Sequence, residues 1–349
     1  MTSDELLVWT EGPIGRLRLN RPEALNALTH DMALGIEKAL LNWRDDIEID
    51  AIVICATGDR AFCAGGDIQD LYNSGLKSPE PGREFWRDEY RLNALIKSYP
   101  KPYVAIMNGI TMGGGVGVSA HGSHRIVTEK TMVAMPETSI GFLPDVGGTY
   151  LLSRAPGETG LYLGLTGARM NAADAIFAGF ADHYVPSAKL PEMVASMSTD
   201  TAPDEAIESV EETAPDGALK GLQDKISQAF SQPDALACVQ QLQMMATEGD
   251  EWAEKTCNKI AKNSPLAVAT TFAAIHKARK LSTLEECLSL EYSFAHRALA
   301  GHEFLEGIRA MVIDKDRKPD WRPAMLEDVT PEMVEDMLAP LGEAEWKAA

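Results

Sequence analysis

The feature that most constrains the fold of this 349-residue chain is a pair of glycine-rich segments, each of which follows strand-like apolar residues. One segment is Cys63–Asp67, which holds two adjacent glycines, and the other is Gly113–Gly115. The apolar runs Ala51–Cys55 and Lys101–Met107 predict buried strands. Because a helical pattern follows each glycine-rich segment, the sequence predicts an α/β fold with a site where strands give way to helices.

The first part of the chain continues this alternation of strands and helices. Residues 6–9 and 15–20 flank a Gly-Pro turn and predict an opening β-hairpin. Thr29 is expected to cap a helix that runs to about Trp43. The pattern is typical of an α/β architecture in which ligands gather beyond the carboxyl ends of the strands.

The character of the chain changes near residue 200. Acidic residues accumulate from 200 to 216 with no Lys or Arg before Lys220, which indicates a solvated helix face or connector rather than an acidic partner-binding segment. Beyond it the pattern is helical, and one apolar face is predicted from Leu284, Leu288, Tyr292, Ala295 and Leu299. We therefore predict an α/β core over residues 1–195 and a helical region over residues 196–349.

The charge balance argues against several classes of partner. Lys and Arg total 32 against 52 Asp and Glu, a net charge of −20 that repels nucleic acid and anionic lipid. The five cysteines form no Cys-x-x-Cys pair, so we expect reduced thiols and no zinc cluster. No apolar stretch approaches the ~18 residues of a membrane span, and the N-terminus does not resemble a signal peptide, so a cytoplasmic location is expected.

The glycine-rich segments allow two interpretations. They can serve only as tight turns, which is the more common role of an isolated glycine cluster. They can also aim two main-chain N–H groups at one oxygen, as an oxyanion hole for acyl chemistry. Neither segment matches a nucleotide-binding fingerprint, so a dinucleotide fold is not supported.

A third segment, Ala134–Tyr150, carries two carboxylates in an irregular and largely apolar context. Buried carboxylates that lie close together acquire different pKa values, which suits Glu137 and Asp145 to catalysis. In the alternative interpretation, Glu137 caps backbone amides and Asp145 caps a helix that opens at Val146. The residues alone leave both interpretations open.

Several blocks of the sequence carry a family resemblance. Asn20–Leu28, Arg60–Ile68, Asn108–Gly115 and the Glu137 segment resemble, in order and spacing, the blocks of the crotonase (enoyl-CoA hydratase/isomerase) superfamily. Phe304–Trp321 resembles the C-terminal signature of a hydrolase branch of that superfamily. The resemblance implies a crotonase-like ββα spiral core with a helical C-terminal region.

The resemblance also implies roles for particular residues. The Gly66 and Gly114 N–H groups would form the oxyanion hole, and Glu137 matches a catalytic glutamate. Asp145 matches an aspartate of the hydrolase branch. Hydratases carry a second catalytic glutamate where this chain has Gly117, a departure that weakens the hydratase interpretation.

The implied substrate is an acyl-CoA. The resemblance implies CoA contacts from Ala64, Asp67, Ile68, Arg21 and Leu25, and Arg60 and Lys101 are further candidates for the CoA phosphates. No metal or redox cofactor is expected, since CoA enters as part of the substrate, and a homo-oligomer is possible. The leading hypothesis is hydrolysis of a short, branched 3-hydroxyacyl-CoA in valine breakdown, and the alternatives are an enoyl-CoA hydratase/isomerase and a non-catalytic acyl-CoA binder.

Overall fold

The computed structural model describes residues 4–199 and 201–348, and their contacts divide the chain into two compact units. Each unit is built from three segments. Unit 1 comprises Met1–Asp67, Asp88–Val133 and Met170–Ala218, and unit 2 comprises Ile68–Arg87, Ala134–Arg169 and Leu219–Ala349. The units therefore interleave along the sequence, whereas the predicted boundary near residue 195 divides it once, and that boundary stays a prediction.

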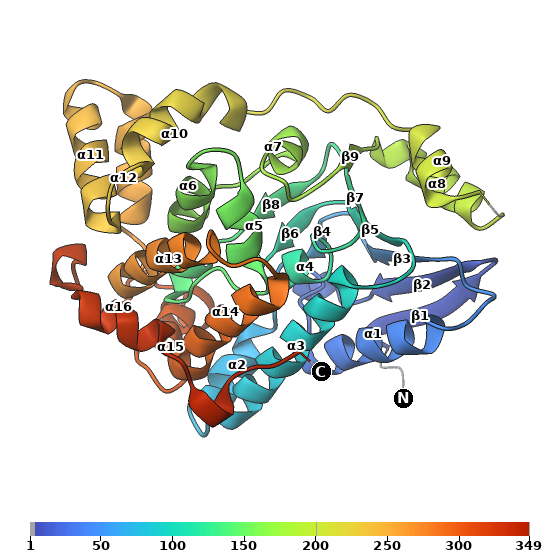
Figure 1. Cartoon of the computed structure of the whole chain (residues 1–349), viewed down its shortest axis with the longest axis horizontal. Coiled ribbons are helices and arrows are strands. Elements are labelled where there is room, and N and C mark those ends of the chain that lie inside the picture. Colours follow the sequence, from blue (N-terminus) through green and yellow to red (C-terminus); the bar gives the residue numbers. More distant parts are fainter. Residues whose placement is uncertain (1–3, 200, 349) are drawn as a thin grey trace. The chain divides into compact units, whose positions relative to one another are not determined.

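The strands of unit 1 form a six-stranded sheet with the order β1-β2-β3-β5-β7-β9 (Figure 1). Its strands are β1 (Leu6–Glu11), β2 (Ile14–Leu19), β3 (Ala51–Ala56), β5 (Tyr103–Met107), β7 (His124–Val127) and β9 (His183–Tyr184). The first two strands pair antiparallel and confirm the predicted hairpin, and the remaining pairs are parallel. Parallel strands buried on both faces explain the continuous apolar runs in the sequence.

Both faces of this sheet are covered by helices of unit 1. The side chain of Thr29 accepts a hydrogen bond from Met32 N and caps α1 (His30–Trp43), as predicted. A Cβ atom on Gly15 would lie 2.6 Å from the Trp43 ring, so α1 packs directly on β2. Unit 1 also contains η1 (Pro22–Ala24), α4 (Gly114–Gly117), α7 (Ala172–Phe177), η3 (Ser187–Lys189), α8 (Leu190–Met197) and α9 (Pro203–Glu208).

The acidic segment after residue 200 belongs to unit 1. In α9 the side chains of Ala206 and Ile207 are buried in one apolar cluster with Val53 and Val104 of the sheet. Asp204 and the glutamates of α9 remain exposed. The prediction of a solvated helix face is therefore confirmed, and contact with the sheet carries unit 1 past residue 195.

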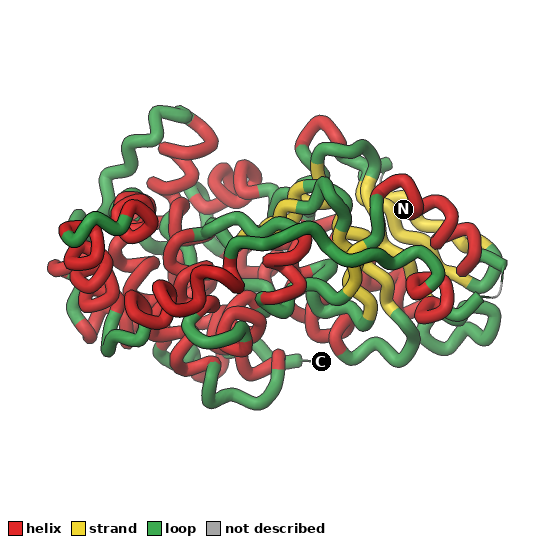
Figure 2. The backbone as a smooth tube through the Cα atoms, turned by 90° about the horizontal axis from the view of Figure 1, so that it is seen from above, coloured by secondary structure: helices red, strands yellow, loops and turns green. Residues whose placement is uncertain are grey.

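A second, smaller sheet has the order β4-β6-β8, with strands β4 (Ala61–Cys63), β6 (Ile110–Met112) and β8 (Met132–Ala134). Figure 2 shows the strands in yellow, gathered in one part of the chain. In the described residues after β9, every element is helical, which agrees with the predicted helical C-terminal region.

Unit 2 consists mainly of helices. They are α2 (Ile68–Gly75), η2 (Glu137–Ile140), α5 (Gly148–Arg154), α6 (Thr159–Thr166), η4 (Leu219–Leu222), α10 (Gln223–Phe230), α11 (Ala235–Thr247), α12 (Glu251–Ile260), α13 (Pro265–Ala278), α14 (Leu284–Ala298), α15 (Glu303–Ile308), the π-helix η5 (Arg309–Ile313), η6 (Leu326–Asp328), α16 (Pro331–Leu338) and η7 (Gly342–Ala344). The helix α3 (Glu80–Lys97) contributes to both units. The predicted apolar face of α14 is buried, which confirms that prediction.

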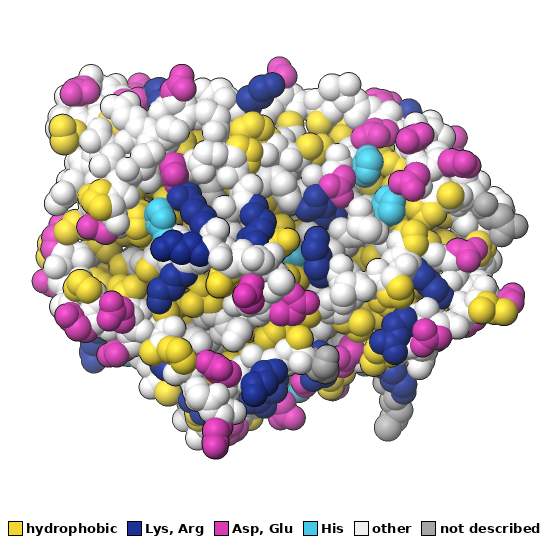
Figure 3. Space-filling view, in the orientation of Figure 1, with side chains coloured by type: hydrophobic (Ala, Val, Ile, Leu, Met, Phe, Trp, Pro, Cys, Tyr) yellow, Lys and Arg dark blue, Asp and Glu magenta, His cyan; other side chains and the backbone are white. Residues whose placement is uncertain are grey.

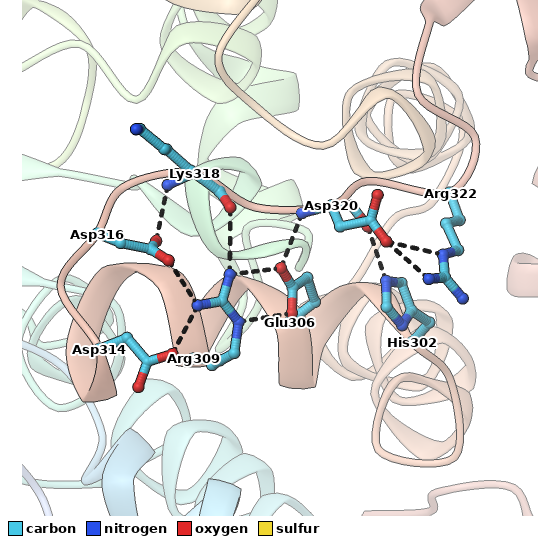
Figure 4. A network of polar contacts seen from close by, with 8 residues as sticks. All are labelled: His302, Glu306, Arg309, Asp314, Asp316, Lys318, Asp320 and Arg322. Atoms are coloured by element: carbon cyan, nitrogen blue, oxygen red, sulfur yellow. Dashed lines mark hydrogen bonds and ion pairs between the residues drawn. The ribbon is translucent and has the colours of Figure 1, made fainter.

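The C-terminal block that carries part of the resemblance closes on itself around one arginine (Figure 4). The Arg309 guanidinium donates to the carboxylates of Glu306, Asp314 and Asp316 at 2.7 to 2.8 Å. Glu306 also accepts from the main-chain N–H of Asp320 at 2.8 Å. These contacts fasten the loop after α15 to the helix before it.

The described helices include none that is long and apolar enough to cross a membrane. On the face drawn in Figure 3, acidic side chains are scattered and do not gather in a single patch.

Candidate active site

In unit 1, the two glycine-rich turns are brought together by strand pairing. The strands β4 and β6 are parallel neighbours, so their carboxyl ends lie at the same edge of the small sheet. Gly65 and Gly66 follow β4, and Gly113 and Gly114 follow β6. Both turns stand at strand-to-helix junctions, as predicted, but the strands that lead into them are β4 and β6, whereas the sequence predicted only the preceding strands β3 and β5.

Glycine is required in these turns for conformation and for close approach. Gly65 has φ +122° and Gly113 has φ +47°, backbone conformations that side chains disfavour. A Cβ atom on Gly115 would lie 2.2 Å from the carbonyl oxygen of Cys63. Only a residue without a side chain allows α4 to approach the first turn so closely.

The N–H groups of Gly66 and Gly114 have no acceptor within the described parts of the chain. Leu28 pairs with this turn as in a parallel sheet: its N–H donates to the Gly65 carbonyl at 2.8 Å, and its carbonyl accepts from the Asp67 N–H at 2.9 Å. The Gly66 N–H takes part in neither bond. Gly114 begins α4, and the first N–H groups of a helix have no partner within it. A Cβ atom on Gly114 would lie 3.3 Å from Gly66 N, so the two donors are close neighbours.

A carboxylate that the sequence analysis missed lies beside these amides. Glu89 on α3 is 2% exposed, and its Oε1 would lie 2.6 Å from a Cβ atom on Gly114. The available signal was its position, because Phe85 and Trp86 one turn before it and Asn93 one turn after it are buried as well. An acidic residue on an apolar helix stripe is uncommon without a specific role.

Cys63 lies at the end of β4 and is fully buried. Burial raises the pKa of its thiol to about 12, so the thiol stays protonated near neutral pH. This agrees with its interpretation as a packing residue.

The residues suggested for CoA contacts have identifiable structural partners. Arg21 forms ion pairs with Glu5 and Asp67, both at 3.0 Å. Leu25 adopts φ +53°, and its carbonyl accepts from the Ala64 N–H at 3.1 Å. Arg21 thus pairs with Asp67 and Leu25 with Ala64 beside the first turn, and their role toward CoA stays a prediction.

The other candidates for CoA contacts, Ile68, Lys101 and Arg60, make different contacts from this group. Ile68 opens α2, which belongs to unit 2. The Lys101 ammonium donates to the carbonyls of Trp43 and Asp46 at 2.5 and 2.6 Å, which satisfies acceptors at the C-terminal end of α1. Arg60 contributes its carbonyl to the Ile110 N–H at 3.2 Å. Their contribution to CoA binding is likewise a prediction.

In unit 2, Glu137 opens the short helix η2, which follows β8 after Met135 and Pro136, and it is 6% exposed. Its Oε2 has no hydrogen-bond partner in the described residues. Burial raises the pKa of Glu137 well above its ordinary value, and the carboxylates of Asp145 and Glu291 raise it further. Glu137 is thus a buried, electrostatically coupled carboxylate.

The turn that carries Glu137 is held by two residues from the start of α13. Asn263 Nδ2 donates to Thr138 Oγ1 at 3.0 Å and to the Leu165 carbonyl at 2.9 Å. The Ser264 N–H donates to the Thr138 carbonyl at 3.0 Å. These bonds restrict the residue next to Glu137 from both its main chain and its side chain.

An aromatic cluster anchors the middle of the segment between the two carboxylates. The Phe142 ring lies 5.0 Å from Trp86, 5.2 Å from Phe294 and 4.7 Å from Phe304, measured between ring centroids. These three partners come from α3, α14 and α15. The segment is irregular in sequence but tightly packed.

Asp145 is also 6% exposed, and it does not act as the helix cap considered from the sequence. The helix α5 starts at Gly148, and its N-cap is Gly147, which provides no side-chain acceptor. The capping acceptor comes instead from Glu291 on α14, which was missed by the sequence analysis. Its position seven residues after Leu284, on the apolar face of α14, was the available signal.

The described residues thus contain two separate candidate groups, the paired amides with Glu89 in unit 1 and three buried carboxylates in unit 2. A family profile for enoyl-CoA hydratase/isomerase matches residues 14–338. The chain belongs to the enoyl-CoA hydratase/isomerase family. The resemblance drawn from the sequence blocks is confirmed.

Within this family the chain is similar over nearly its whole length to curated hydrolases. It is 40% identical to the mitochondrial 3-hydroxyisobutyryl-CoA hydrolase of Danio rerio, covering 98% of this chain and 91% of that protein. It is 39% identical to the protein of the same name from Homo sapiens, covering 99% of this chain and 91% of that protein.

Solved structures of family members carry other names. An enoyl-CoA hydratase from Rhodobacter sphaeroides is 44% identical with a TM-score of 0.93, covering 98% of this chain and 99% of that one. A carnitinyl-CoA dehydratase from Mycobacterium thermoresistibile is 43% identical with a TM-score of 0.93, covering 97% of both chains. These similarities confirm the crotonase fold, and the names divide between thioester hydrolysis and hydration.

Proposed function

We propose that this family member hydrolyses the thioester of a short, branched 3-hydroxyacyl-CoA, with 3-hydroxyisobutyryl-CoA as its substrate in valine breakdown. The observation that carries the proposal is the buried Glu137 carboxylate with a free oxygen in the described chain, coupled to Asp145. Support comes from the curated relatives, which are named for this reaction and match nearly the whole chain.

In the proposed mechanism, the two glycine-rich turns bind the thioester carbonyl oxygen. Negative charge develops on that oxygen as the carbonyl carbon is attacked, and the Gly66 and Gly114 N–H groups are donors with no other acceptor in the described residues. Preorganised main-chain donors of this kind stabilise such charge, and each contributes about 3 kcal/mol to the transition state.

The proposed attacking or activating group is a buried carboxylate. Glu137 either attacks the carbonyl carbon, expelling the CoA thiolate and leaving a mixed anhydride that water then cleaves, or removes a proton from water that attacks directly. Asp145 accepts a hydrogen bond from the 3-hydroxyl of the substrate or from the water, which fixes the reacting geometry. An acyl group without the hydroxyl could not make this hydrogen bond and is disfavoured.

A second candidate function is hydration of an enoyl-CoA, or the reverse dehydration. It is favoured by the names of the two solved structures and by Glu89, a second carboxylate beside Gly114. It is opposed by Gly117, where the resemblance expects a catalytic glutamate in hydratases. The buried position of Gly117 in α4 offers no side chain for proton transfer.

One experiment separates these candidates from a non-catalytic binder. The protein is incubated with 3-hydroxyisobutyryl-CoA, with release of free thiol as the readout, and separately with crotonyl-CoA, with loss of the conjugated double bond as the readout. We expect thiol release from the first substrate. Loss of the double bond from crotonyl-CoA without thiol release from 3-hydroxyisobutyryl-CoA would support the hydratase. The absence of both signals would support a non-catalytic binder.

Glu137→Gln tests the proposed mechanism directly. The amide can neither attack the carbonyl nor accept a proton, so we expect thiol release to fall by about 10²- to 10⁴-fold or more. Glu254→Gln, at an exposed position on α12, is the matched control and should retain wild-type activity. Wild-type rates from Glu137→Gln would remove Glu137 from the mechanism.

Location and assembly remain separate from this proposal. The curated relatives are named as mitochondrial proteins, which does not support the predicted cytoplasmic location. The predicted possibility of a homo-oligomer stays a prediction. Acyl-CoA is the proposed small-molecule partner, in keeping with the family.

A further inference from the structure

We propose that Glu291 is a positioning residue, which holds the turn after Asp145 in the conformation that catalysis requires. This inference rests on the proposed function, since it concerns the reaction in which Asp145 takes part. Glu291 lies on α14, far along the sequence from the carboxylate segment, and all the contacts that support the inference are within unit 2.

Both carboxylate oxygens of Glu291 accept hydrogen bonds from the start of α5. Oε2 accepts from the Gly147 N–H at 2.7 Å, and Oε1 accepts from the Thr149 N–H at 2.8 Å and from the Thr149 hydroxyl. Glu291 is fully buried. A buried carboxylate with three donors forms a directional clamp, because each donor is held by the main chain or by a short side chain.

The clamped turn has an unfavourable backbone conformation. Val146 has φ +53°, a region that a β-branched residue rarely adopts, and Gly147 follows with φ +79°. Such a conformation persists only where surrounding contacts determine it. Asp145 directly precedes Val146, and its carbonyl accepts from the Gly148 N–H at 2.7 Å. Asp145 precedes the strained Val146, and Glu291 holds the N–H groups of Gly147 and Thr149, which follow it.

The electrostatics of Glu291 agree with a role inside the site. Burial raises the pKa of Glu291 to about 8, while its bonds to Thr149 and Gly147 oppose that rise. The charge of Asp145 also raises the pKa of Glu291, and Glu291 in turn raises the pKa of Glu137. Burying an ionisable side chain here costs free energy of folding. A serine or threonine could cap the helix without that cost.

The test is a double-mutant cycle between Glu291 and Asp145, read by kcat and KM for thiol release from 3-hydroxyisobutyryl-CoA. Glu291→Gln keeps one acceptor for Thr149 but turns an amide NH₂ toward the Gly147 N–H, so the turn loses part of its clamp. We expect kcat to fall by about 10-fold to 10²-fold, because small displacements of a reacting group have effects of that size. In an Asp145→Asn background the same change should have an effect of less than about threefold.

A merely structural role predicts a different outcome. Glu306→Gln is the control, since Glu306 is a clamp for Arg309 in the same unit and its loss should weaken stability without coupling to Asp145. If Glu291→Gln and Asp145→Asn act additively on kcat, as the control should with Asp145→Asn, the positioning inference is wrong. Non-additivity for Glu291 alone supports it.

A milder variant covers the case in which Glu291→Gln does not fold. Thr149→Val keeps the shape of the side chain and removes only the hydroxyl donor to Glu291. It should lower kcat severalfold in the wild type and leave it unchanged in the Asp145→Asn background, and additivity would again overturn the inference. Failure of the proposed function is recognised separately, since the wild-type protein would then release no thiol.

Discussion

The candidate groups of unit 1 and of unit 2 are positioned by different kinds of contact. In unit 1 the donors are main-chain N–H groups placed by paired strands and by glycine conformations, and their chemistry does not depend on a side chain. In unit 2 the groups are buried carboxylates, placed by hydrogen bonds and aromatic packing from distant helices. The first part is fixed by topology, whereas the second depends on individual side chains.

This difference predicts how each part responds to change. An amide pair does not titrate, and it is disturbed mainly by atoms added at a glycine. Buried carboxylates respond to pH and to the loss of any partner that holds them. Variants in each unit can therefore show whether the two parts are as independent as their construction suggests.

The largest effect on stability is expected from Phe142→Ala. Removing the ring from the aromatic cluster leaves a cavity among Trp86, Phe294 and Phe304, which should cost about 3–5 kcal/mol of the free energy of unfolding. Denaturant unfolding measures the cost, and hydrogen exchange locates it. Exchange should accelerate around η2 and α5 and stay unchanged at α4, and equal acceleration at both would break the comparison.

Gly114→Ala should damage catalysis more than stability. Its Cβ atom would meet the Glu89 side chain, which can move, and would enter the space next to Gly66 N. We expect thiol release to fall by about 10²- to 10³-fold. Gly115→Ala is the contrasting variant, because its Cβ atom would meet the rigid carbonyl of Cys63, so it should unfold at lower temperature. Gly221→Ala has open space around its Cβ atom and serves as the neutral control.

A smaller effect is expected from Asn263→Ala. The change leaves the Thr138 hydroxyl and the Leu165 carbonyl without their donor, at a cost of about 1–3 kcal/mol in stability. Because Thr138 is next to Glu137, activity should fall severalfold with little change in KM. A stability loss with fully retained kcat would show that the Glu137 turn does not depend on α13.

The smallest effect concerns the pH dependence of stability. Burial and two neighbouring carboxylates raise the pKa of Glu137 in the folded chain above its unfolded value. The folded state then holds its proton more tightly, so the contribution to stability is present in acid and is lost as pH rises through the raised pKa.

Glu137→Gln removes this titration. The melting temperature of the variant relative to that of the wild type should rise by a few degrees as pH increases from about 5 to 8. Melting curves across that range measure it. A difference that stays constant with pH, as expected for Glu254→Gln, would show that the fold does not raise the pKa of Glu137.

The sequence predicted those elements whose signals are local. The hairpin, the Thr29 cap of α1 and the apolar face of α14 each follow from periodicity or from a capping residue, and each is confirmed. The two glycine-rich turns were located correctly, because conformational demands are visible in residue type. Their use as an oxyanion hole came from the family resemblance and stays part of the proposal.

The partners of the site could not be predicted in the same way. Glu89 and Glu291 reach their positions from helices whose packing depends on the whole fold, and no local pattern says which turn a buried carboxylate contacts. Asp145 resembled a helix cap because Asp often is one, but the structure gives that task to Glu291. The available signal was an acidic residue on the apolar face of a helix. That position predicts burial but does not identify the turn that the carboxylate contacts.

At Val146, thermal stability and the positioning of the Asp145 carboxylate favour different residues. Its left-handed backbone costs about 1–3 kcal/mol relative to a relaxed turn, which glycine would recover. An engineer who seeks a more heat-resistant enzyme would choose this position early. The same replacement would give the neighbouring acid a freer main chain, so the gain in endurance would come with looser control over where its oxygens point.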